Sequence, residues 1–320
     1  MSHAAMFFRD NRTRLAEALK GGLVVLTAYS EMQRKADQAF AFEQEANFWY
    51  LSGITSPRWR LVYDGIRQHT WLVRPDVDEV ERVFNGEADS EALLAGSGAD
   101  EIVDEGDFEQ LLRQLKQTHS TVYTVTPAPA DRYSFVQNPA NKQLTRILER
   151  IFPAVSDCAS DIARLRAIKQ PNEIMAIERA VKLTMEAFEK LHTQLDMCHY
   201  EYELEAITTG LFRQKGVYHA YDPIVAAGKN ACTLHYVANT ERLRKKQLVL
   251  CDIGAQYDGY AADITRTYAY GVMTARQSAV LSALTDARRR LFVQLHQGCH
   301  LPPISRRVIG LWLAHCAHLG

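Results

Sequence analysis

Two β-type runs joined by an Asp-Gly pair constrain the fold of this chain more than any other segment. Residues 248–257 and 260–267 are rich in apolar, β-branched and aromatic side chains, and Asp258-Gly259 lies between them. An Asp-Gly pair between two such runs predicts a β-hairpin with a two-residue loop. The segment therefore predicts two antiparallel strands in a defined register.

That register places two acidic side chains on one face of the hairpin. Counting back from the turn, Asp252 lies opposite Thr265, and Asp263 lies opposite Gly254. Because side chains alternate along a strand, Asp252 and Asp263 become diagonal neighbours on the same face. Two carboxylates at so short a distance repel each other unless a cation lies between them. Hard divalent metals bind oxygen ligands, and carboxylates can bridge a metal pair ~3.5–4 Å apart. The geometry predicts a dinuclear metal site. The alternative, two aspartates that only end strands, stays open because a β-bulge would change the parity.

The composition bounds the class of protein. A chain of 320 residues predicts two domains, and a net charge of −1 gives no basic excess for nucleic acid or an anionic membrane surface. No run approaches the ~20 apolar residues of a membrane helix, and residues 1–14 contain no signal-peptide core. The six cysteines show no CxxC pair or disulfide-type spacing, which indicates reduced thiols. We expect a soluble cytoplasmic protein.

Helical and strand patterns alternate through the first half of the chain, which predicts an α/β domain over residues 1–155. The predicted helices span residues 7–20, 90–96, 107–117 and 141–151, and the predicted strands span 23–28, 60–63, 70–73 and 121–125.

The domain boundary falls near residues 152–172, and we expect a second domain over residues 165–320. Pro171 is placed to open a long helix, and a second helix is expected at about 201–214. Apolar residues of the first helix lie at helical spacing and predict a single buried stripe. They are Ile174, Ile177, Val181, Phe188, Leu191 and Leu195.

Four segments, in order, resemble the Xaa-Pro aminopeptidase (aminopeptidase P) family. They are residues 40–53 (FAFEQEANFWYLSG), residues 165–174 (LRAIKQPNEI), residues 221–236, and the pair DIG at 252–254 with DITRT at 263–267. One such segment would be weak evidence, but four in sequence order are specific. The resemblance extends over nearly the whole chain, to about residue 295.

The resemblance implies a fold, a reaction and a cofactor. The fold is an α/β architecture in which an aminopeptidase P-type N-terminal domain precedes a pita-bread catalytic domain. The reaction is release of the N-terminal residue from a peptide whose second residue is proline, and this peptide is the implied partner. The implied cofactors are two divalent ions, usually Mn²⁺, and a hydroxide that bridges the two ions would be the nucleophile. Further copies of the chain, in a homo-oligomer, are left open as partners.

Residue roles carry over only where the motifs match. Asp252 and Asp263 match metal ligands, with Asp263 in the bridging position. His235 matches a histidine of the substrate pocket and is our catalytic and substrate-binding candidate, although a strand residue bonded to backbone is the alternative. Tyr221 matches a substrate-pocket tyrosine more loosely, and an ordinary core tyrosine is its alternative. Arg266 could pair with a carboxylate ligand or cap its strand.

The chain also departs from the family pattern. The family uses one further histidine and two glutamates as ligands, and no glutamate follows Glu241. The tail, residues 296–320, does not carry the expected motifs. We therefore expect an incomplete pita-bread domain, a C-terminus altered by truncation or a frame change, and little activity. Two rival functions are a Xaa-Pro dipeptidase and a non-catalytic binding or oligomerisation protein, although the retained aspartate pair argues against the second.

Overall fold

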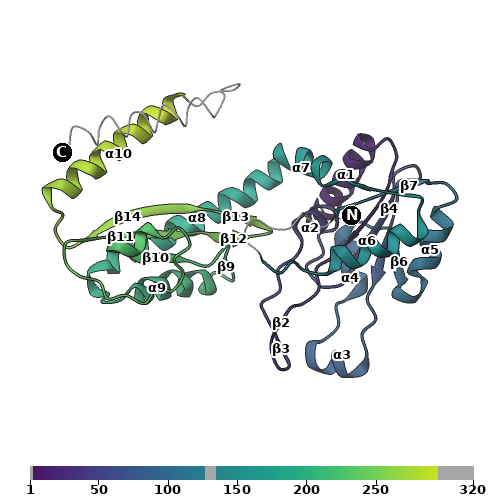
Figure 1. Cartoon of the computed structure of the whole chain (residues 1–320), viewed down its shortest axis with the longest axis horizontal. Coiled ribbons are helices and arrows are strands. Elements are labelled where there is room, and N and C mark those ends of the chain that lie inside the picture. The colour runs from purple at the N-terminus through teal and green to yellow at the C-terminus, as the bar shows by residue number, and fades with distance from the viewer. Residues whose placement is uncertain (1–2, 127–134, 295–320) are drawn as a thin grey trace. The chain divides into compact units, whose positions relative to one another are not determined.

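The computed structural model of the chain describes residues 3–126 and 135–294 and divides into two compact units, Met1–Lys169 and Gln170–Gly320 (Figure 1). The expected tail features at residues 296–320 lie outside the described part. The first unit extends past residue 155 because Cys158 and Ile162 are fully buried in its core.

A six-stranded mixed sheet forms the centre of the first unit, in the order β6-β5-β4-β1-β7-β8. The pairs β1–β4 and β4–β5 are antiparallel. The pairs β5–β6, β1–β7 and β7–β8 are parallel. The bounds are β1 Leu23–Thr27, β4 Arg60–Asp64, β5 His69–Arg74, β6 Glu101–Asp104, β7 Thr121–Thr124 and β8 Ala154–Asp157. β2 (Gln33–Lys35) and β3 (Gln38–Ala39) form a separate small hairpin.

Helices cover both faces of this sheet because its central strand is apolar on both sides. Val24 and Leu26 of β1 join one buried cluster with residues of α1, α2 and α7, whereas Leu23 and Val25 join another with α5 and α6. The helices are α1 His3–Ala18, α2 Ala46–Ser52, α3 Glu79–Asn85, α4 Ser90–Ser97, α5 Phe108–Leu115, α6 Ala140–Ile151 and α7 Ala159–Ala167. The α/β prediction is confirmed, with all four predicted helices and all four predicted strands of this unit present.

The second unit packs two helices on one face of an antiparallel sheet with the order β10-β11-β14. Figure 1 shows α8 and α9 running beside these strands. The bounds are α8 Pro171–Gln194, α9 Glu201–Gln214, β10 Ile224–Ala227, β11 Gln247–Ile253 and β14 Ile264–Tyr270. A second small sheet contains β9 Tyr218–His219, β12 Ala255–Tyr257 and β13 Tyr260–Ala261. The helix α10 consists of Ala275–Gln294. None of the described helices has the length and apolarity to cross a membrane.

The predicted apolar stripe of α8 is correct in its C-terminal half and wrong in its N-terminal half. Phe188 and Leu191 are buried, but Ile174 is 45% exposed and Val181 is 38% exposed. The buried face at that end consists instead of Glu173, Ala176, Ala180, Leu183 and Thr184. Thr184 accepts a hydrogen bond from the backbone N–H of Ala255 at 2.9 Å, so small and polar side chains let the helix approach the hairpin.

Candidate metal centre

The hairpin around residue 258 forms as predicted. Tyr257 pairs with Tyr260, and Asp252 pairs with Thr265. Asp258 and Gly259 both have positive φ, 49° and 77°, as a two-residue hairpin loop with the twist of the strands requires.

The β11–β14 pair and the β12–β13 pair keep one continuous register. No β-bulge therefore changes the face on which Asp252 and Asp263 lie. The N–H of Ala262 donates to the carbonyl of Ala255 at 3.0 Å, which continues the pairing across the break between β12 and β11. Cys251 and Ile253 are fully buried in the cluster formed with α8 and α9. Asp252 lies between them in a strand, so its side chain projects from the opposite face.

Tyr221 shows directly that the two aspartates converge. Its hydroxyl oxygen lies 2.6 Å from Oδ1 of Asp252 and 3.2 Å from Oδ1 of Asp263. The two carboxylate oxygens are therefore separated by no more than the sum of these distances, within the ~6 Å expected for a diagonal pair. Tyr221 is half-buried and its hydroxyl contacts both carboxylates, so it is not the ordinary core tyrosine of the alternative interpretation.

Gly254 makes this arrangement possible. A Cβ atom at this position would lie 1.7 Å from the carbonyl oxygen of Ala262 and 3.1 Å from the Tyr221 ring. The Gly254 carbonyl in turn accepts a hydrogen bond from the N–H of Ala220 at 2.8 Å, one residue before Tyr221. Glycine thus lets the opposite strand and the tyrosine approach the hairpin backbone between the two aspartates.

The electrostatics keep Tyr221 protonated. Burial raises the pKa of its hydroxyl, and the hydrogen bond to Asp252 and the two negative charges raise the pKa further. Because a hydroxyl has one proton, Tyr221 can donate to only one carboxylate at a time. The cluster therefore presents two carboxylates and a phenol oxygen, all of them hard oxygen donors.

This donor set fits a hard divalent cation in chemistry, and it supplies only part of a coordination sphere. Within residues 3–126 and 135–294, no group of three or more His, Cys, Asp or Glu side chains is placed to hold a metal. The described residues thus contain two of the predicted ligands, Asp252 and Asp263, and bring them together on one face.

His235 lies in a turn after the 3₁₀ helix Gly228–Cys232, and its side chain is exposed. It is not the strand residue of the alternative interpretation. In the part of the chain that the structure describes, no hydrogen bond joins His235 to Asp252 or Asp263. Arg266 pairs with neither aspartate; its Nη1 donates to the Thr265 carbonyl at 2.9 Å.

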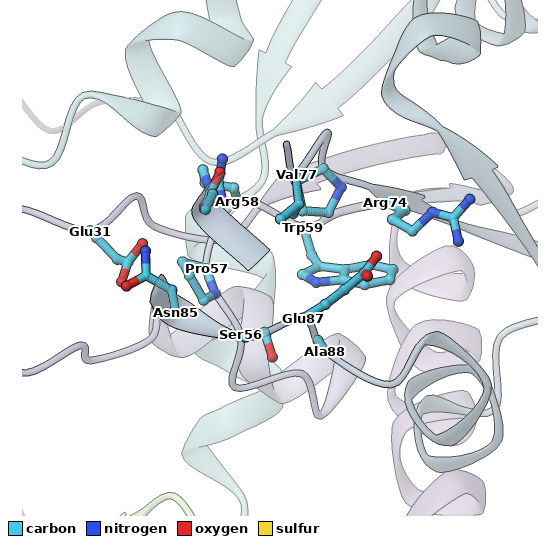
Figure 2. A pocket seen from close by; sticks show the side chains of 13 residues that line it. Glu31, Ser56, Pro57, Arg58, Trp59, Arg74, Val77, Asn85, Glu87 and Ala88 are labelled. Atoms are coloured by element: carbon cyan, nitrogen blue, oxygen red, sulfur yellow. Dashed lines mark hydrogen bonds and ion pairs between the residues drawn. The ribbon is translucent and has the colours of Figure 1, made fainter. Parts of the chain in front are cut away.

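A cavity of about 320 Å³ in the first unit contains none of the predicted site residues. Figure 2 shows its lining, with the Trp59 ring on one side and Arg58, Arg74, Glu31 and Glu87 around it. Arg58 and Glu81, which both line the cavity, form an ion pair. It does not bear on the aspartate pair.

Comparison with known proteins assigns both units. The profile of metallopeptidase family M24 matches residues 175–312, and the profile of the aminopeptidase P N-terminal domain matches residues 8–123. The first match continues to residue 312, so the family resemblance extends beyond the expected end at about residue 295. Asp252, Asp263, Tyr221 and His235 all lie within it.

Individual relatives agree with these profiles. The Xaa-Pro aminopeptidase of Escherichia coli is 26% identical over 326 residues, covering 98% of this chain and 73% of the relative. A probable Xaa-Pro aminopeptidase of Pyrenophora teres f. teres is 30% identical, covering 80% of this chain and 27% of the relative. The solved structure of E. coli aminopeptidase P in a low-pH form superposes with a TM-score of 0.88 at 25% identity, covering 100% of this chain and 75% of that one.

The fold and the matched segments define a mixed α/β metallopeptidase in which an N-terminal domain precedes a pita-bread domain. The chain belongs to the Xaa-Pro aminopeptidase (aminopeptidase P) family of M24 metallopeptidases, which is a family of enzymes.

Proposed function

We propose that this chain is a metal-dependent aminopeptidase that releases the N-terminal residue from peptides whose second residue is proline. The observation that carries the proposal is the convergence of Asp252 and Asp263 on one face of a hairpin within the M24-matched segment. The names of the relatives support the reaction class. A zinc-substituted E. coli aminopeptidase P solved in complex with product supports a divalent metal.

Each site residue has a separate task in this proposal. Asp252 and Asp263 would hold two divalent ions, which we propose to be Mn²⁺. Bound divalent ions supply polarisation of the scissile carbonyl and a lowered pKa for water. Tyr221 and His235 would contact the peptide, and the Tyr221 hydroxyl also lies within hydrogen-bond distance of both carboxylates. A peptide bond to proline has no N–H, so recognition must depend on shape and on the carbonyl group.

Hydrolysis of a defined peptide tests the proposal. With Mn²⁺ added, we expect release of the first residue from a Xaa-Pro-Xaa tripeptide, and loss of that release with a chelator or in Asp263→Asn. Asp258→Asn is the matched control, because the same change is made at the exposed turn and asparagine tolerates its positive φ. Equal turnover in wild type and Asp263→Asn would contradict the proposal. Cleavage of the Xaa-Pro dipeptide alone would identify a dipeptidase.

A further inference from the structure

The outer edge of β10 is closed by two side chains. β10 pairs with β11 on its inner side, where Ile224 lies opposite Asp252. On its outer side, the N–H of Val225 donates to Oδ1 of Asn239 at 2.9 Å, and the N–H of Ala227 donates to Oε1 of Glu201 at 2.7 Å. The Asn239 contact attaches the loop of residues 228–241, which carries His235, to the strand that pairs with Asp252, and the Glu201 contact attaches the start of α9 to the same strand.

Glu201 connects the two ends of that loop. Its side chain is fully buried, and each carboxylate oxygen accepts two hydrogen bonds. Oε1 accepts from Ala227 at 2.7 Å and from Nδ2 of Asn230 at 3.2 Å, where the loop begins. Oε2 accepts from the Tyr236 hydroxyl at 2.8 Å and from the N–H of Glu241 at 2.9 Å, where the loop ends. A buried carboxylate with four donors is fully satisfied and fixes each donor in place.

Tyr236 transmits this constraint to its neighbour. Desolvation and the hydrogen bond to Glu201 raise the pKa of the Tyr236 hydroxyl, so it stays a proton donor at neutral pH. His235 is exposed and precedes Tyr236 directly. The position of its backbone therefore follows from the anchored tyrosine rather than from contacts of its own imidazole with the aspartates.

We propose that Glu201 is a positioning residue that, through Tyr236, fixes the 228–241 loop and so holds His235 in place beside the strand pairing with Asp252. The inference rests on the proposed role of His235 in binding the peptide. It assigns to a buried residue at the start of α9 a part in substrate binding, although Glu201 does not touch the substrate.

Two substitutions weaken the attachment of the 228–241 loop to Glu201 by different amounts. Glu201→Gln keeps the shape but replaces one accepting oxygen with an amide nitrogen, which faces two donors. Tyr236→Phe removes only the hydroxyl next to His235. Glu203→Gln is the control: Glu203 belongs to the same first turn of α9 and caps it through the N–H of Tyr200 at 3.1 Å, a task that glutamine also performs.

Three readouts are needed: hydrogen exchange of the loop amides, the NMR resonances of the His235 imidazole, and binding of a Xaa-Pro-Xaa peptide. We expect loop exchange to rise about tenfold in Glu201→Gln and several-fold in Tyr236→Phe, with shifted His235 resonances in both and no change in Glu203→Gln. Peptide binding should weaken in both variants, as in His235→Ala, while His235→Ala leaves loop exchange as in wild type. If Glu201→Gln does not fold, Tyr236→Phe decides.

The results separate the two levels of the proposal. Unchanged loop exchange and unchanged His235 resonances in Tyr236→Phe would overturn the positioning role. Faster loop exchange with His235 resonances and peptide binding unchanged would also overturn it, because Glu201 would then be structural only. If wild-type protein does not bind the peptide, the proposed function fails, and the His235 resonances still show whether Glu201 positions that side chain.

Discussion

The hydroxyl of Tyr221 lies 2.6 Å from Oδ1 of Asp252, across 31 residues of sequence. The same hydroxyl reaches Asp263 at 3.2 Å, so one neutral donor lies between two like charges. This contact places a hydrogen-bond donor between the two carboxylates and fixes how far apart they can lie.

Tyr221→Phe should therefore destabilise the second unit. The change removes the donor and leaves two adjacent carboxylates without it, which costs ~1–2 kcal/mol. Urea unfolding at neutral pH measures the loss. Tyr257→Phe, at the exposed tip of the same hairpin, should change stability by less than ~0.5 kcal/mol. Equal stability of wild type and Tyr221→Phe would mean that the contact does not contribute.

Gly254→Ala should be far more damaging than its size suggests. The new Cβ would lie 1.7 Å from the Ala262 carbonyl oxygen, so the hairpin must open between the aspartates. We expect a loss of ~3 kcal/mol or more in thermal or urea unfolding. Gly210→Ala should instead raise the free energy of unfolding. Nothing lies within 4 Å of a Cβ at this position, and alanine favours the helix by ~1 kcal/mol.

Arg12 should be essential to the first unit. The residue is 1% exposed, and its guanidinium donates to the carbonyls of Leu51, Ser97 and Gly98 at 2.7–3.0 Å. Burial lowers its pKa to about 10, so it remains charged at neutral pH. Arg12→Met leaves three buried carbonyls unsatisfied and should cost ~3 kcal/mol or more. Arg9→Met removes a single exposed ion pair and should cost under ~1 kcal/mol.

Cys158 should make the first unit sensitive to alkaline pH. Burial raises the pKa of its thiol from 9.0 to about 12, with nearby Asp157 and Asp161 adding to the effect. The folded pKa is above the unfolded one, so the thiol's contribution is complete below pH 9 and is lost as the pH rises towards 12. Urea unfolding between pH 8 and 11 should show a steeper decline in wild type than in Cys158→Ala. Parallel curves would contradict the assignment.

The sequence predicted the elements that carry strong local signals. The Asp258-Gly259 turn determined the register of β11 and β14, and therefore the shared face of the two aspartates. Long amphipathic helices such as α6 and α9 were also predicted closely. β6 and β8 were missed because strands of four residues with half-exposed sides show little alternation. α3 was missed because none of its residues is buried.

The remaining parts of the site depend on contacts between distant segments. No local pattern indicates that Tyr221 reaches Asp252, or that Glu201 binds Tyr236, 35 residues later. The α8 stripe failed for a related reason. Ala176 and Ala180, rather than Ile174 and Val181, face the hairpin, because close helix–sheet approach favours small side chains over large apolar ones there.

Calorimetric titration with Mn²⁺ tests the central claim, a metal site shared by Asp252 and Asp263, most directly. For binding to these two carboxylates we expect a dissociation constant on the order of 0.1–1 mM. Asp252→Asn and Asp263→Asn should each weaken binding at least ~tenfold, because a neutral amide lacks the charge that holds the ion, and Asp258→Asn should bind as wild type does. Unchanged Mn²⁺ affinity in Asp263→Asn would contradict the shared site.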